Sequence, residues 1–416
     1  MLDRGDPVVA VELIEGDGPD EFIDFGDRLA AFDYEDVDHG KDSCNILLRN
    51  WNLSLLEDRR FARGQKLRVS WGYSGGMAPP RDVVIKKIHG LDLLQIACEG
   101  KVTELDQEVK VRAWEQMTVG EIAAEIAFNE QNLDGKFVHI VEPDGITHEC
   151  INQHYSDARF LAKLARDHGC VFCFNHTGFH FHPRDMAAAP RKVLIYRTDP
   201  GRGDIIKLVP DSDFSRSIGK VVIKSRDPNT GEEFEVEASN QDTDRDGLGK
   251  AWEVGNPATV SGNLAKRNAT AITRYVSGAT KDQAKLEAQK RFKLAAQFRF
   301  KLTAYCHGDP VHSARNVYEL QGAGQYLEGN YYCKRAKHSI KGSYQTELYL
   351  IRDSALEAPT IIDPEKSNAA INDQEVVDDS LLRPVVVWED GPDGQPQQVI
   401  QWRDSRGNIV DTPAQP

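Results

Sequence analysis

One stretch of the sequence has acidic residues at the spacing of a calcium-binding loop. Asp242, Asp244 and Asp246 occupy alternate positions, Gly247 follows at once, and Glu253 comes six residues after the glycine. An EF-hand loop places oxygen ligands at positions 1, 3 and 5, a turn glycine at position 6 and a bidentate glutamate at position 12. Carboxylates that converge on a hard cation offset their mutual repulsion, so the pattern allows a calcium site.

Two features of this loop argue against calcium. Position 8 is Gly249, where an EF-hand usually has a β-branched apolar residue, and the flanks have the pattern of strand and loop rather than of two helices. The chain also has 65 acidic residues, which makes an acidic surface loop unremarkable. We therefore favour a solvated hairpin loop, keep calcium as the alternative, and assign no catalytic, cofactor-binding or metal-binding residues.

A second group of residues has the types that bind zinc, which needs four ligands in a tetrahedral array. Cys170 and Cys173 have the CxxC spacing, and His180 and His182 lie two apart. Residues three apart on a strand point to opposite faces, so the two cysteines are expected to diverge. We therefore expect separate buried thiols and surface histidines rather than one site. The whole group is His148, Cys150, His154, His168, Cys170, Cys173, His176, His180 and His182.

The sequence favours neither an enzyme nor a nucleic-acid-binding protein. It has no P-loop, no G-x-G-x-x-G after a strand and no H-E-x-x-H. The net charge of −14 argues against DNA or RNA binding, which needs clustered Lys and Arg. We expect no enzyme and no sequence-specific nucleic acid as a partner.

Composition also bears on location and redox state. No run approaches the about 18 apolar residues of a membrane-spanning helix, and the first residues lack a basic and an apolar region. We expect a chain without a membrane anchor, made in a cytoplasm. The seven cysteines are odd in number and widely spaced, so free thiols are expected.

The elements that must position these residues follow a β, α+β, β order. Short strand-like runs fill residues 7–100, separated by Gly, Asp and Asn turns. Thr118 and Glu121 form a capping box before a helix that extends to Phe128, and a strand follows at 136–141. A second helix runs from Ser156 to Gly169, and a hairpin follows it.

Strands return after residue 190, interrupted by one helix from 281 to about 294. The expected domains are a first β-barrel domain (1–100), an α+β insert (101–189), a second β-barrel domain with one helix (190–356), a linker (357–383) and a C-terminal strand extension (384–416). The last segment has two or three short strands and would need to pack on a partner.

At the second helix the sequence resembles a known family. QHYSDARFLAKLARDHGCVFCFNHTGFHFH is similar to the segment SD-x-x-FL-x-x-LA-x-x-x-G of the bacteriophage late control gene D family, tail-hub proteins related to the hub part of type VI secretion spike proteins. FARGQKLRVSWGY and TVGEIAAEIA agree with its N-terminal part. HGDP followed by VYELQGAGQYLEGNYYCKRAKHSIKGSYQTELYL agrees with its C-terminal part. The resemblance covers about residues 7–353.

The resemblance implies a mainly β fold with an α+β insert, in which two tube-like β-barrels are joined by α+β domains. Hubs of this family are trimers, whose six barrels form a pseudo-sixfold ring that adapts a sixfold tail tube to a threefold spike. The implied place is the virion tail baseplate. The implied partners are two further copies of the chain, the tail tube or a tube-initiator protein, the tape-measure protein and baseplate wedge components. No long β-helix repeat follows residue 353, so the spike is expected to be a separate protein.

Two other functions compete with the hub. A calcium-dependent β-rich binding module is supported only by the loop from Asp242 to Glu253. A tail-associated hydrolase lacks any lytic motif, and the family-like segments leave no room for a separate lytic domain.

Overall fold

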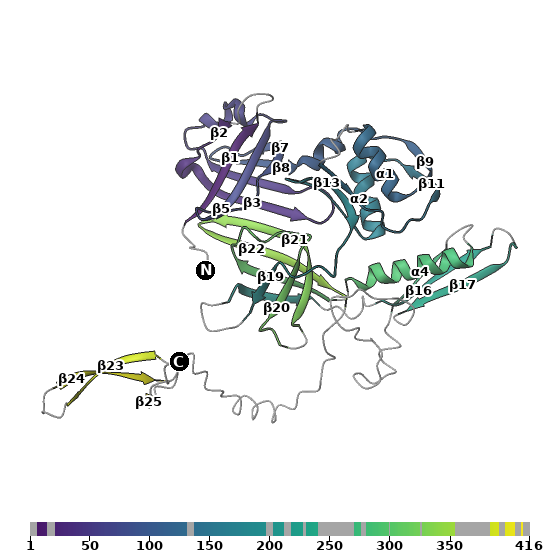
Figure 1. The fold of residues 1–416 in the computed structure, drawn as a ribbon. Helices are drawn as coiled ribbons and strands as arrows, with labels where there is room; N and C mark the ends of the chain where they lie inside the picture. Colours follow the sequence, from purple (N-terminus) through teal and green to yellow (C-terminus); the bar gives the residue numbers. More distant parts are fainter. Residues whose placement is uncertain are drawn as a thin grey trace. The chain divides into compact units, whose positions relative to one another are not determined.

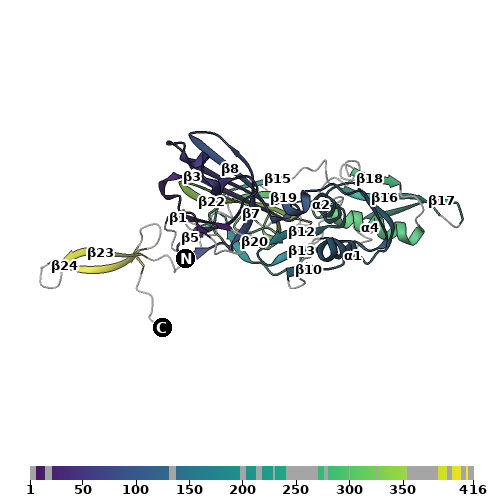
Figure 2. The same ribbon diagram turned by 90° about the horizontal axis from the view of Figure 1, so that it is seen from above.

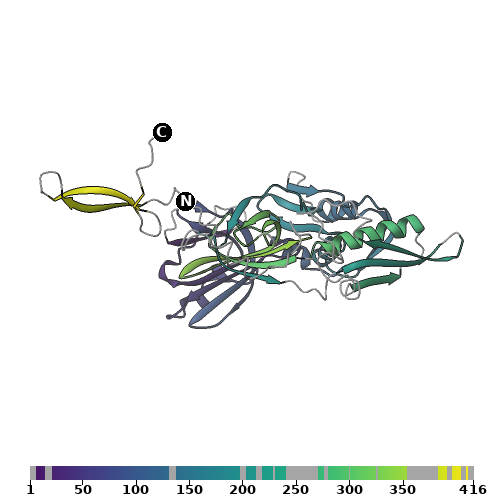
Figure 3. The same cartoon turned by 90° about the horizontal axis from the view of Figure 1, so that it is seen from below.

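The computed structural model divides into two compact units, residues 1–358 and 359–416, which are described separately. The structure describes residues 6–14, 21–130, 137–196, 203–211, 218–227, 230–239, 270–275, 280–298, 300–324, 327–353, 383–390, 396–403 and 409–410. Figures 1, 2 and 3 show the ribbon from three sides.

The N-terminal strands belong to a 14-stranded sheet that dominates the first unit. In this part their order is β3-β4-β8-β7-β5-β1-β2, and β6 pairs with β5. Alternating side chains face a core that includes Phe32, Ile46 and Val69. The strands are β1 (Pro7–Ile14), β2 (Glu21–Phe22), β3 (Leu29–Val37), β4 (Ser43–Arg49), β5 (Lys66–Tyr73), β6 (Gly76–Met77), β7 (Arg81–His89) and β8 (Leu93–Gly100). Short 3₁₀ turns η1 (Gly26–Arg28), η2 (Ser54–Leu56), η3 (Arg59–Phe61) and η4 (Lys101–Asp106) lie between or after them.

Strands that follow residue 190 complete the same sheet. Their order is β15-β19-β22-β21, and β20 pairs with β21 and β14. These strands are β14 (Lys192–Ile195), β15 (Ile205–Asp211), β19 (Phe300–His307), β20 (Val317–Gln321), β21 (Gly329–Lys341) and β22 (Ser343–Arg352). They have a core of their own, which includes Leu302, Tyr331 and Leu348.

The two β units meet where β21 pairs with β3, antiparallel from Arg335↔Val37 to Ile340↔Phe32. Figure 1 shows the purple and green strands side by side at this joint. The mainly β class with an α+β insert is confirmed. Within the described residues, however, neither half closes on itself as the expected barrels would, because β3 pairs with β21 instead of returning to the far strands of its own half.

The α+β insert follows the first β unit. Thr118 and Glu121 form the expected capping box, and α2 begins after the cap Ser156 and ends at Gly169, whose φ is +69°. The buried faces of the two helices pack on the β12–β13 hairpin. The elements are β9 (Arg112–Met117), α1 (Val119–Glu125), the π-helical turn η5 (Ile126–Glu130), β10 (Val138–Ile140), β11 (His148–Gln153), α2 (Asp157–His168), β12 (Cys170–Asn175) and β13 (Gly178–Pro183).

A second α+β part lies within the region that the sequence assigned to the second barrel. The strands over 218–239 do not join the large sheet. They form a separate three-stranded sheet, order β17-β16-β18, covered by α4 (Figure 3). The reason is the core: alanines and Phe292 on one face of α4 pack on Val221 and Ile223 of β16. The elements are β16 (Ile218–Arg226), β17 (Glu233–Ser239), β18 (Thr270–Tyr275) and α4 (Lys281–Ala296).

The C-terminal unit has one small antiparallel sheet. Its order is β23-β24-β25, with Trp402 opposite both Pro384 and Val410. The strands are β23 (Arg383–Asp390), β24 (Pro396–Arg403) and β25 (Ile409–Val410), as the sequence predicts for two or three short strands. Within the described residues of the whole chain, no helix has the length and apolar character needed to cross a membrane.

Candidate functional site

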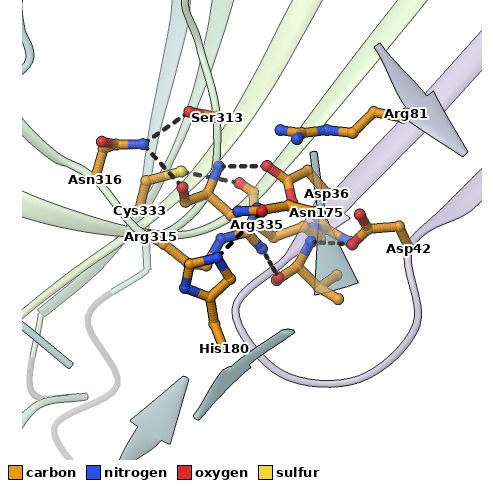
Figure 4. Close-up of polar contacts among 12 residues, drawn as sticks. Asp36, Asp42, Arg81, Asn175, His180, Ser313, Arg315, Asn316, Cys333 and Arg335 are labelled. Carbon is orange, nitrogen blue, oxygen red and sulfur yellow. Dashed lines mark hydrogen bonds and ion pairs between the residues drawn. The ribbon is translucent and has the colours of Figure 1, made fainter. Parts of the chain in front are cut away.

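An acidic residue lies on the buried face of β3, next to the joint between the two β units. Phe32, Tyr34 and Asp36 alternate along this strand, and Asp36 is only 2% exposed. A buried carboxylate loses its hydration and needs partners. Arg315 Nη2 donates to its Oδ1 at 2.5 Å, and the Ala314 N–H donates to its Oδ2 at 3.1 Å (Figure 4). Both oxygens of this carboxylate are therefore paired.

Arg315 joins the two β units through backbone and side chain together. Its φ of +66° lies in the left-handed region, which is uncommon for a residue other than glycine. Its N–H donates to the carbonyl of Cys333 on β21, and its guanidinium donates to the carbonyl of Val37 as well as to Asp36. Burial alone would lower the pKa of Arg315, but Asp36 foremost among its neighbours raises it well above its usual value. The guanidinium therefore stays charged, and the contacts of Arg315 with Cys333, Val37 and Asp36 hold β21 beside β3.

A second buried ion pair connects the first β unit to both α+β parts. Arg184 Nε donates to Asp38 Oδ2 at 2.7 Å, and the two side chains are 3% and 2% exposed. Arg184 Nη1 donates to Gln297 Oε1, just after α4, at 3.2 Å. Burial would raise the pKa of Asp38, but contacts with His39 and Arg184 lower it below its usual value.

A third acidic residue of the same hairpin, Asp42, is 4% exposed. The hydroxyl of Tyr34 donates to its Oδ2 at 2.8 Å, and the N–H of Val37 donates to its Oδ1 at 3.1 Å. Burial, and then the nearby charge of Asp36, raises the pKa of Asp42 to about 6. Asp36, Asp38 and Asp42, with their partners, form what we call the polar junction.

A cavity of about 270 Å³ adjoins the polar junction. His312, one of its lining residues, is 1% exposed, and neither ring nitrogen has a hydrogen-bond partner among the described residues. Burial lowers the pKa of His312 to about 3, so the ring is neutral. In the junction, Asp36 and Asp38 pair with Arg315 and Arg184, whereas Asp42 accepts from a hydroxyl and a backbone N–H. The arrangement is suited to holding parts of the chain together rather than to acid–base or nucleophilic chemistry. Further lining residues are Trp71, Arg81, Cys173, His180 and Arg315.

The histidines and cysteines that the sequence grouped do not form one site. His180 and His182 gather with His139, at ring separations of 5.3–6.0 Å. Cys170 packs into the core of the insert, whereas Cys173 faces the cavity beside Arg315, so the two diverge as expected. His154 and His176 are exposed. All seven cysteines are free, and six of them are buried; Cys150 is exposed.

The structure does bring two members of that group together, with a residue that the sequence did not single out. His148, His168 and Asp144 each have a potential ligand atom within 4.8 Å of the other two. Lys290 of α4 contacts Asp144 and His168. Burial would raise the pKa of Asp144, but its contacts with His168 and Lys290 lower it well below its usual value. We call Asp144, His148, His168 and Lys290 the insert cluster.

Local signals explain only part of this outcome. The residues of the insert cluster are separated by up to 146 positions, so spacing in the sequence could not reveal it. For the polar junction one signal existed: Asp36 continues the alternation of Phe32 and Tyr34 onto the apolar face of the strand. The loop from Asp242 to Glu253 lies outside the described residues.

Comparisons of the fold with solved structures find several tail proteins. A tail protein from Neisseria meningitidis MC58 is 13% identical with a TM-score of 0.57, over 84% of this chain and 97% of that one. The 43 kDa tail protein of prophage MuSo2 from Shewanella oneidensis is 11% identical with a TM-score of 0.56, over 84% and 99%.

A component of a type VI secretion system has the same fold. It is the E. coli c3393 protein, described as structurally similar to the T4 bacteriophage tail proteins gp27 and gp5. It is 11% identical with a TM-score of 0.50, over 85% of this chain and 80% of that one. No family model and no curated protein matches the sequence. The chain thus has the mostly β, several-sheet fold of these phage tail and secretion proteins.

Proposed function

We propose that this chain is a structural component of a phage tail or related injection particle, specifically its baseplate hub, and not an enzyme. The observation that carries the proposal is the joint between the two β units. Strands from the two ends of the first unit share one sheet through β21 and β3, and the buried Arg315–Asp36 pair fixes the joint. A component that transmits force between a tube and a spike needs such a rigid connection. The likeness in fold to tail proteins and the resemblance in sequence to late control gene D proteins support it.

The proposed assembly is a homotrimer whose six β units form a pseudo-sixfold ring. Among the described strands, β15 and β2 end the order of the large sheet. Most of β15 is exposed, including Ile206 at 47% and Val209 at 38%. An exposed edge strand offers unpaired backbone groups to another chain. We infer that β15 is covered by a neighbouring copy.

The proposed partners follow from the position of a hub. Above it would lie the tail tube or a tube-initiator protein, below it a separate spike protein, inside it the tape-measure protein, and around it baseplate wedge components. The proposed location is the tail baseplate of a particle assembled in the host cytoplasm. Residues 357–416 are proposed to attach one of these partners.

The experiment is the mass of the full chain in solution, by light scattering at micromolar concentration. We expect a trimer. Ile206→Lys and Val209→Lys should shift it toward monomer, whereas Leu286→Lys, at a residue of α4 that is 50% exposed, should not. A stable monomer, in solution and in purified particles alike, contradicts the hub. A monomer that binds calcium stoichiometrically would favour the alternative function, a calcium-dependent binding module.

Deletion of residues 357–416 tests the proposed role of the C-terminal segment. Because the division between the two compact units falls near residue 358, the remaining chain should still form trimers. Particles assembled with the truncated chain should lose or bind more weakly one other component, visible by electron microscopy and protein composition. Normal particles would show that the segment is dispensable.

A further inference from the structure

The insert cluster has an arrangement of atoms that a single cation would satisfy. Asp144 Oδ2 and His168 Nδ1 lie 2.9 Å apart, and Lys290 Nζ lies 2.5 Å from the former and 2.7 Å from the latter. An ammonium only donates and a carboxylate only accepts. The one nitrogen Nδ1 cannot accept from Lys290 and donate to Asp144 at the same time. With Nδ1 as acceptor, two electron pairs face a shared positive charge, which Lys290 supplies.

His148 adds a third potential ligand to this pair. One of its ring nitrogens lies within 4.8 Å of Asp144 and His168, and its Nε2 is buried without a hydrogen-bond partner. Its ring packs edge-on against that of His168, with centroids 5.7 Å apart. Among the described side chains, this nitrogen is one of few buried polar atoms left unpaired. Such an atom needs an explanation, and an ion is one.

We propose that Asp144, His148 and His168 bind a divalent transition metal of the zinc type, in exchange with the ammonium of Lys290. Two imidazoles and one carboxylate are a ligand set that zinc accepts at about 2.0–2.2 Å, with a fourth position left for water. In tetrahedral coordination such ligand atoms lie about 3.3 Å apart, so small side-chain rotations bring the three to the metal. The N–H of Ile146 donates to Asp144 Oδ1 at 3.1 Å and leaves Oδ2 for the ion.

The exchange has a structural consequence. Lys290 comes from α4, whereas the three ligands come from the insert, on the loop before β11, on β11 itself and at the end of α2. In the metal-free state the ammonium ties α4 to the insert. A dication between the same two atoms repels the ammonium, so metal binding breaks that connection. The metal is therefore held by the insert alone and weakens its contact with the second α+β part.

The test is metal binding to the full chain in a Cys150→Ser background, because Cys150 is the exposed thiol and could bind zinc on its own. Isothermal titration with Zn²⁺ should give one site per chain. His148→Ala and Asp144→Asn should weaken it at least about tenfold, whereas His154→Ala, which removes an exposed histidine outside the cluster, should not.

Lys290→Met gives the decisive result because it should raise the affinity for Zn²⁺, whereas the ligand variants should lower it. Removal of the competing ammonium should strengthen Zn²⁺ binding at least about tenfold. The visible absorption of bound Co²⁺ reports the ligand set independently and shows that each variant keeps a formed site or has lost it. The proposal is overturned if no stoichiometric site exists, if His148→Ala binds as well as the parent, or if Lys290→Met binds no more tightly.

Discussion

Replacement of Arg315 by methionine tests whether the polar junction holds the two β units together. The Arg315 and Asp36 side chains are 12% and 3% exposed. Removal of one partner from such a buried pair leaves an uncompensated charge and costs about 3–5 kcal/mol. Arg335 is a matched control on the same strand pairing. It contacts Glu35 and Glu347 but is 38% exposed, so Arg335→Met should cost less than about 1 kcal/mol.

The assay is urea denaturation followed by circular dichroism, with the free energy of unfolding taken from the first transition. The double variant Asp36→Asn, Arg315→Met removes both charges and should recover most of the loss, because no unpaired charge remains. Equal losses for Arg315→Met and Arg335→Met would refute the reasoning.

Three further predictions concern single residues. The pKa of Asp42 is about 6 in the folded chain against an ordinary value of 3.8, so the folded state binds a proton more tightly and stability falls as the pH rises from 3.8 to about 6. This pKa difference corresponds to about 3 kcal/mol of unfolding free energy. Asp42→Asn should flatten the dependence of stability on pH in denaturation curves taken across that range. Thiol titration should count seven free thiols in denaturant but only Cys150 in the native chain, because the other six are buried and burial raises the pKa of Cys170, Cys173 and Cys306 to about 12. A Cys150→Ser variant should show no reactive thiol in the native chain. Gly169→Ala should lower the free energy of unfolding by about 2–3 kcal/mol, because φ is +69° and an added Cβ would collide with Leu294 Cδ2. Gly145→Ala, at φ +62° with open space around it, should lower it only by the backbone strain of about 1–2 kcal/mol. Equal melting temperatures for the two variants would contradict this prediction.

Local signals in the sequence predicted the local structure well. The Thr118 capping box, the Ser156 cap and the C-terminal Gly169 depend on hydrogen bonds between residues three or four positions apart. The residues that form them are therefore close together in the sequence. The divergence of Cys170 and Cys173 followed from strand geometry alone. None of these local features depends on the rest of the chain.

The pairing of segments that are far apart in the chain could not be predicted from local sequence signals. The strands over 218–239 look like those of the large sheet, and only the approach of α4 decides that they form their own. Asp144 and Lys290 are unremarkable surface-type residues until folding places them 2.5 Å apart. The alternation that buries Asp36 shows that it needs a partner, but it does not say which of the basic residues in the chain supplies it.

Charged groups at the joint have an effect that apolar ones would not. A slip of one residue between β21 and β3 would turn every side chain of β3 to the other face, because the side chains of a strand alternate. Asp36 lies opposite Ala336 in the observed register, and the loop that carries Arg315 is tied to β21 at Cys333. An apolar residue at position 36 would tolerate several nearby arrangements of an apolar neighbour. A buried carboxylate tolerates only those in which a donor reaches it, and the alternative costs several kcal/mol. We therefore infer that the Asp36–Arg315 pair contributes mainly to the choice of register, and so to the fixed relation between the two β units on which the proposed hub depends.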